Sequence, residues 1–151
     1  MNFNYLQLFI ILIVAGMTVE LAEAQNRPGD REAGVILGEP TGISAKFWRD
    51  GNSAYDLGLA WSFGRGGKLH IHSNYLIHRS LDPPDVYFYY GLGARLLFRD
   101  DPEAAARVPA GIQYFIPDTR LTLFLEIAPM LNLIPETKFL LNGGLGMRIF
   151  I

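Results

Sequence analysis

Bulky apolar residues alternate with small or polar residues along much of the chain, with a period of two. Residues 54–63 (AYDLGLAWSF) show it best: Tyr, Leu, Leu, Trp and Phe occupy the odd positions, and Ala, Asp, Gly, Ala and Ser the even ones. Successive side chains of a β-strand point to opposite faces of the sheet. This stretch therefore predicts a strand with one bulky apolar face and one small polar face.

The same alternation, interrupted by turn residues, predicts eight strands. Pro, Gly, Asp and Asn gather between the alternating stretches, as in Glu39–Gly42 and Arg49–Ser53, and they favour turns. The connections are short; the longest, Arg99–Ala106, has residues 104–106 as a candidate helical turn. The strands are expected at 34–38, 43–48, 54–63, 68–78, 86–98, 107–115, 121–134 and 139–151.

Two prolines lie within predicted strands. Pro109 and Pro129 have no N–H to donate to a neighbouring strand, and a closed barrel has no free edge where that loss would cost nothing. We therefore expect Pro109 near a strand end and a β-bulge at Pro129.

The bulky faces of these strands cannot all point inward. The interior of an eight-stranded barrel is only wide enough for side chains to fill it, and this many large residues would not fit. With the small polar faces inside and the bulky faces toward lipid, the conflict disappears. Aromatic residues near strand ends, such as Trp48, Tyr55, Trp61 and Phe98, are typical of interfacial girdles. The sequence therefore predicts an all-β fold, an eight-stranded antiparallel up-and-down transmembrane β-barrel.

Composition and the first residues agree with an exported membrane protein. Of the 151 residues, 50% are hydrophobic and only 19% are charged, below the roughly 25% of an average soluble domain. The apolar run Leu8–Met17 is too short to span a bilayer, and residues 22–24 (AEA) follow it as a cleavage site. We expect a signal peptide at 1–24 and one outer-membrane β-barrel domain at 25–151.

Charge and cysteine content exclude several classes of function. Glu20 and Glu23 lie in the leader, which leaves 13 acidic and 13 basic residues in the mature chain. A neutral chain without a basic patch predicts no nucleic-acid partner. The absence of cysteine excludes disulfides, thiolate metal sites, a cysteine nucleophile and lipid attachment through an N-terminal cysteine.

Several runs resemble known outer-membrane barrels. Residues 144–151 (GLGMRIFI) alternate to the end of the chain, like the closing strand that barrel-assembly machinery recognises, although the aromatic residue here is penultimate. Residues 33–151 resemble small eight-stranded proteins of the OmpA-barrel and OmpX type. The runs 38–42 (GEPTG), 44–48 (SAKFW) and 56–63 (DLGLAWSF) are similar to a family of uncharacterised bacterial barrels.

The resemblance implies a location and a set of partners. The location is the outer membrane of a diderm bacterium, reached after signal-peptide-dependent export. The partners are outer-membrane lipid, lipopolysaccharide and the barrel-assembly machinery, and a monomer is expected. The family offers no activity to transfer to this chain.

Almost every charged residue of the predicted strands falls on the small polar face. We interpret these residues as a structural network in which buried charges satisfy one another, because an unmatched partner is costly. Glu126 is expected between Arg95 and Arg148, and Lys46 beside Asp56. A gated or proton-conducting lumen is the alternative, but eight strands leave no porin-like channel. The predicted lumen residues are Lys46, Asp56, His70, His72, Asn74, His78, Arg95, Gln113, Glu126, Asn132, Asn142 and Arg148.

Two patterns suggest chemistry, and neither suffices to assign it. His70 and His72 share the polar face and could bind a metal, but no motif fixes further ligands. His72-Ser73-Asn74 resembles the His-x-Ser-Asn motif of outer-membrane lipid A deacylases, but adjacent residues of a strand point to opposite faces. We therefore assign no catalytic residue, metal ligand or cofactor.

The sequence favours a structural or interaction protein over an enzyme. A deacylase-like enzyme that modifies lipid A is the first alternative, and a soluble lipocalin-like carrier of an apolar ligand is the second. If the N-terminus lies in the periplasm, the turns at 39–42, 64–67, 99–106 and 135–138 face outward.

Overall fold

β-Strands make up most of the described chain. The computed structural model describes residues 31–38, 41–62 and 67–151; the predicted leader, turn residues 39–40 and residues 63–66 lie outside it. Within the described ranges, no helix is long and apolar enough to cross a membrane. The strands are β1 (Arg31–Gly38), β2 (Gly42–Trp48), β3 (Ser53–Ser62), β4 (Lys68–Ser80), β5 (Val86–Phe98), β6 (Glu103–Arg107), β7 (Ala110–Phe115), β8 (Leu121–Ile134) and β9 (Lys138–Phe150).

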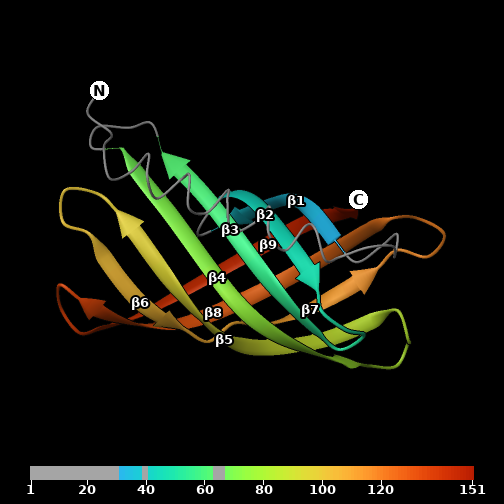
Figure 1. Ribbon diagram of the computed structural model, residues 1–151. Coiled ribbons are helices and arrows are strands. Elements are labelled where there is room, and N and C mark those ends of the chain that lie inside the picture. Colours follow the sequence, from blue (N-terminus) through green and yellow to red (C-terminus); the bar gives the residue numbers. More distant parts are fainter. Residues whose placement is uncertain (1–30, 39–40, 63–66) are drawn as a thin grey trace.

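The strands form one closed antiparallel ring with eight positions (Figure 1). Strands β1 to β5 pair in chain order, and β9 closes the ring by pairing with β1. One position is shared by β6 and β7, which both pair with β5 and with β8. The predicted eight-stranded antiparallel barrel is therefore confirmed.

The strands are strongly tilted in this ring. Consecutive residue pairs lead from Arg148 on β9 once around the barrel and back to β9 at Lys138, ten residues earlier. With a rise of about 3.3 Å per residue and about 4.8 Å between strands, this stagger corresponds to a tilt of about 40°. An eight-stranded barrel of this shape has an interior that side chains fill.

Pro109 interrupts the strand predicted at 107–115. The structure has two strands there, because β6 ends at Arg107 and β7 begins at Ala110. Gly91 donates its N–H to the Pro109 carbonyl at 3.0 Å, but proline has no N–H to donate in return. Pro109 therefore lies at a strand end, as expected.

The candidate helical turn at residues 104–106 is wrong. These residues belong to β6 and pair with β5 on one side and β8 on the other. Pairing on both sides satisfies their backbone groups more fully than one isolated turn of helix, which is costly to nucleate.

The β-bulge expected at Pro129 is also wrong. Pro129 pairs with Leu141 on β9 in unbroken register, and its carbonyl accepts the N–H of Val108 at 2.9 Å. The register shift lies instead between Ala104 and Ala105, against β8. Because Pro129 lies beside the break between β6 and β7, its missing N–H falls where the ladder is already interrupted.

The two faces of the wall differ in polarity. Large apolar side chains cover the outside, and Leu92 and Phe139 are each 70% exposed. Polar and charged side chains lie inside. Glycines make room for them and for inward rings: a Cβ added to Gly146 would lie 2.2 Å from the Phe124 ring, and one added to Gly58 would lie 2.1 Å from the His72 ring.

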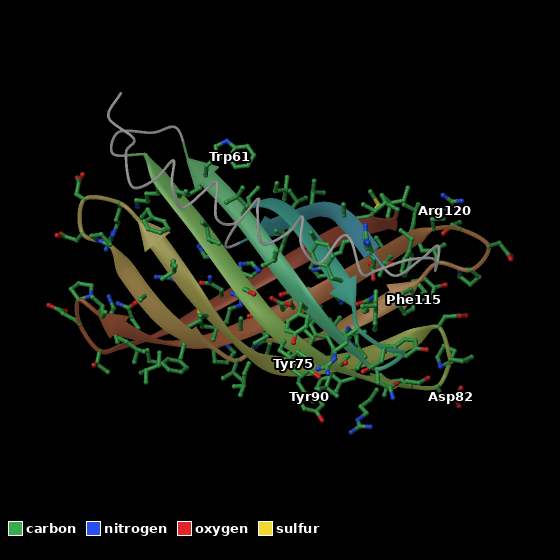
Figure 2. The ribbon with its side chains drawn as sticks, viewed as in Figure 1. Trp61, Tyr75, Asp82, Tyr90, Phe115 and Arg120 are labelled. Carbon is green, nitrogen blue, oxygen red and sulfur yellow. The ribbon has the colours of Figure 1, made fainter. Side chains whose placement is uncertain are left out.

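The barrel has two ends, which we name by the chain termini. The terminal end holds Arg31 and Ile151, joined by a backbone hydrogen bond of 2.9 Å, and the turns 49–52, 81–85 and 116–120. The far end holds the turns 99–102 and 135–137. Figure 2 shows Asp82 and Arg120 toward the terminal end and Trp61 toward the far end.

A polar turn joins β2 to β3 at the terminal end. The Asp50 carboxylate accepts the Ser53 hydroxyl at 2.7 Å and the backbone N–H groups of Asn52 and Ser53 at 2.8 and 2.7 Å. These hydrogen bonds, that of the Ser53 hydroxyl foremost, lower the pKa of Asp50 because they favour the ionised carboxylate.

Candidate functional site

The barrel interior is the region where chemistry-bearing side chains meet. Strand alternation brings them there, since every second residue of each strand points inward. Asn74, Gln113 and Asn132 are buried in the interior and Asn142 is half-buried. All eight residues of the predicted network are buried: Lys46, Asp56, His70, His72, His78, Arg95, Glu126 and Arg148.

Glu126 forms the central ion pair, but with a different partner from the one expected. Its carboxylate accepts hydrogen bonds from the Arg107 guanidinium and, at 2.9 Å, from the Tyr89 hydroxyl. Arg107 and Glu126 are 2% and 3% exposed. The prediction that Glu126 lies between Arg95 and Arg148 is wrong, because β6 lies between β5 and β8 and brings Arg107 next to Glu126.

Arg95 pairs instead with a carboxylate nearer the far end. Its Nη2 lies 2.5 Å from Glu103 Oε2, and Arg99 binds the other oxygen of the same carboxylate. Glu103 is therefore shared by two arginines of different burial, since the side chain of Arg95 is 7% exposed and that of Arg99 is 38% exposed.

Arg148 and Asp56 form a second buried pair. Arg148 Nη2 lies 3.6 Å from Asp56 Oδ2, and Arg148 Nε donates to the Ser44 hydroxyl at 2.9 Å. The guanidinium also lies 3.8 Å from the centre of the Phe124 ring, within cation–π range. Asp56 accepts a further hydrogen bond from Asn74 Nδ2 at 2.6 Å.

Lys46 is directly opposite Asp56 across β2 and β3, but its ammonium group binds elsewhere. Its Nζ donates to Gln113 Oε1 and lies 3.0 Å from His78 Nε2. It also lies 4.9 Å from the centre of the Tyr89 ring. The ion pairs of the described residues do not include Lys46–Asp56, and the expected pairing is corrected accordingly.

Aromatic side chains gather in the interior at the terminal end. Trp48 donates its indole N–H to Glu32 Oε1 at 2.6 Å, and its ring centre lies 6.2 Å from that of Phe115. Phe115 stacks on Phe150 at 5.9 Å and meets Tyr87 edge to face at 5.2 Å. We call Trp48, Tyr87, Phe115 and Phe150 the aromatic floor, because they fill the interior at this end.

The two histidines of β4 contact each other inside the barrel. His70 Nε2 lies 3.4 Å from His72 Nδ1, and the rings are nearly perpendicular. The described residues contain no group of three or more His, Asp or Glu side chains able to hold a metal ion. Ser73 is exposed on the outside, whereas His72 is buried inside. The pairing of β4 with β3 and with β5 continues through both residues without a register shift, so no β-bulge brings them to the same face.

Sequence reasoning missed several residues of the interior network, and it expected Trp48 in an interfacial girdle, whereas the Trp48 indole donates to Glu32 inside the barrel. Arg107 begins the strand predicted at 107–115 in phase with Gln113, and Glu32 lies two residues before the strand predicted at 34–38, so the alternation would have found both. Tyr89 lies on the polar face but reads as an aromatic belt residue. Glu103 lies in a charged segment predicted as a loop, and no sequence signal marks it.

Comparisons with known proteins support the architecture. No protein-family model and no curated protein matches the chain. The crystal structure of the N-terminal β-barrel domain of Pseudomonas aeruginosa OprF is similar in fold, with a TM-score of 0.57 at 13% sequence identity. The match covers 80% of this chain and 95% of that chain. At this identity the similarity shows the barrel fold alone, and the narrower family resemblance stays a prediction.

Proposed function

We propose that the chain is a small outer-membrane β-barrel protein of structural or interaction type, with a polar, side-chain-filled lumen and short loops. The observation that carries the proposal is the inverted polarity of the wall. Charged residues such as Arg107 and Glu126 are buried inside, while Leu92 and Leu141 are 70% and 61% exposed outside. Such an apolar exterior is unfavourable in water and suited to a bilayer.

The arrangement of outer aromatic residues supports a membrane location. Trp61 lies toward the far end (Figure 2), and the outward rings of Tyr55, Phe88 and Tyr114 lie within three residues of their strand ends at the terminal end. Two such belts mark the interfaces of a transmembrane barrel. The proposal includes export by the signal peptide, insertion by the barrel-assembly machinery, contact with outer-membrane lipid and lipopolysaccharide, and a monomeric state.

A structural role is favoured over the two alternatives. A deacylase would need His72 and a serine on one face, whereas Ser73 points outward. A lipocalin-like carrier would need an apolar interior, whereas ion pairs occupy this one. Unchanged lipid A mass spectra on expression of the chain and of its His72→Ala variant would support the proposal; altered lipid A that depends on His72 would contradict it.

Membrane fractionation and gel migration test the proposal. We expect the protein in the outer-membrane pellet, and we expect a compact band in cold detergent that shifts on boiling as the barrel unfolds. A periplasmic protein that needs no detergent and shows no shift would contradict the proposal.

A pair of arginine substitutions on the outer face tests the same proposal energetically. Leu92 lies at the middle of β5, and Leu133 lies next to the last residue of β8. In a bilayer, Leu92→Arg should lower the unfolding free energy by about 2–4 kcal/mol, and Leu133→Arg by about 0–1 kcal/mol. Urea titration in liposomes measures both. Equal, negligible effects would indicate a water-exposed surface.

A further inference from the structure

Cationic side chains gather on the far half of the inner wall. Arg95 and Arg107 are 6% and 2% exposed, and the other cations continue from them toward the rim. Among the described strand residues of this half, four are cations and two are carboxylates: Lys68, Arg95, Arg107 and Lys138, and Glu103 and Glu126. The described turns at this end add Arg99, Asp100, Asp101 and Glu136.

Four of the inner side chains form a continuous surface across three neighbouring strands. His72 on β4 is directly opposite Arg95 on β5, and His70 lies 3.4 Å from His72 through their ring nitrogens. Arg95 and Arg107 are diagonal neighbours on β5 and β6, because Arg95 is opposite Ala105, two residues before Arg107. We call His70, His72, Arg95 and Arg107 the arginine–histidine wall.

Two buried donors of this wall are unused. Arg95 Nε and Arg107 Nε have no hydrogen-bond partner among the described residues, although both atoms are buried. The ion pairs use other nitrogens, namely Arg95 Nη2 to Glu103 and Arg107 Nη2 to Glu126. A buried charged donor without a partner is costly, and a planar guanidinium matches the geometry of a phosphate.

The rest of the interior limits access to this wall to one side. The aromatic floor fills the terminal end, where Trp48 and Phe115 meet. At the far rim, the side chain of Arg99 shares Glu103 with Arg95 and is 38% exposed. A solute would therefore approach the wall from the far end.

We propose that the arginine–histidine wall binds a small, soluble phosphate-type oxyanion from the far end of the barrel. The guanidinium groups supply charge and N–H donors, and the imidazoles of His70 and His72 supply further ring N–H groups. The binding site depends on the barrel interior and not on the membrane location proposed above.

Arginine side-chain NMR tests this site directly in the full-length protein in detergent. Inorganic phosphate should shift the Nε–H signals of Arg95 and Arg107 saturably, and the signal of Arg79, which is exposed in the terminal half of β4, should not move. Arg95→Gln should weaken phosphate binding about tenfold or more, because it removes a charged hydrogen bond. Arg79→Gln is the matched control and should leave the affinity within about twofold.

A second variant gives a result in the opposite direction. Glu103→Gln removes the carboxylate that competes for Arg95 and Arg99, so phosphate binding should become several-fold tighter. The heat shift on a gel shows whether Arg95→Gln folds. If it does not fold, Glu103→Gln and the wild-type titration still test phosphate binding at the wall.

Three results would overturn the site. The first is no saturable shift of the Arg95 and Arg107 signals with inorganic phosphate. The second is an equal loss of affinity in Arg95→Gln and Arg79→Gln, or no gain in Glu103→Gln. The third is a response to phosphatidylglycerol micelles but not to inorganic phosphate, which would assign the wall to a lipid headgroup. A barrel that binds phosphate yet fractionates as soluble would contradict only the membrane proposal.

Discussion

The terminal and far halves of the interior are built by the same strand alternation, but their contents differ. In the terminal half, Glu32, Lys46, Asp56 and Arg148 balance one another in charge, and bonds link them to aromatic and amide side chains. On the described strands of the far half, cations outnumber carboxylates. Both of its buried arginines have an Nε without a partner among the described residues, whereas Arg148 in the terminal half uses its Nε and lacks a partner at Nη1.

The difference shows that the direction in which a side chain points and the partners that it meets are determined separately in a barrel. Alternation decides that a side chain points inward, and the register decides which neighbours it meets. Trp48 and Phe115, from β2 and β7, meet across the interior at the terminal end, and they close it with apolar surface. At the far rim the side chain of Arg99 is 38% exposed, so the ion pairs of this half continue to the solvent.

The largest effect is expected at the junction of the two halves. Glu126→Gln keeps an acceptor for Tyr89 but leaves the Arg107 charge buried without a counter-ion, and it should lower the unfolding free energy by about 3 kcal/mol or more. Urea titration in detergent measures the loss. The double variant with Arg107→Gln should recover much of it, and a single-variant loss below about 1 kcal/mol would show that the pair is screened by water.

The fold could be predicted from the sequence almost completely, because the outer face repeats one signal on every strand. The exceptions lie where proline or alanine weakens that signal. Residues 104–106 are all alanine, so they show no alternation of bulky and small side chains that would predict a strand. They form one because β5 and β8 offer hydrogen-bonding partners on both sides. Pro129 needed no bulge: its carbonyl still accepts the Val108 N–H, the register is the same on both sides of Pro129, and its missing N–H falls between β6 and β7.

The interior residues could be predicted, but their partners could not. Lys46 and Asp56 are directly opposite each other on β2 and β3. The Lys46 ammonium group nevertheless binds Gln113, which lies on β7 at the other side of the barrel. Such contacts across the lumen depend on the stagger and tilt of the strands, which no single strand encodes. The pairing of Arg95 with Glu103 was hidden for another reason: Glu103 lies on the neighbouring strand β6, in a segment that the sequence predicted as a loop.

A smaller effect is expected from the polar bond of the aromatic floor. Trp48→Phe keeps most of the ring area but removes the N–H donor to Glu32, which is 1% exposed, and should cost about 2 kcal/mol of unfolding free energy. Tyr90→Phe, which removes a polar group from an outer-face ring, is the control and should stay within about 0.5 kcal/mol. Equal losses in the two variants would mean that the terminal half is no more tightly bonded than the surface.

The smallest effect is expected at the far rim. Arg99 is 38% exposed and shares Glu103 with the buried Arg95, so Arg99→Gln removes a partner that Glu103 can lose without becoming unpaired. The unfolding free energy should fall by less than about 1 kcal/mol, and the loss should shrink further in high salt, because exposed ion pairs are screened. A loss above about 2 kcal/mol that persists in high salt would show that the far half is as firmly bonded as the terminal half, and the contrast between them would fail.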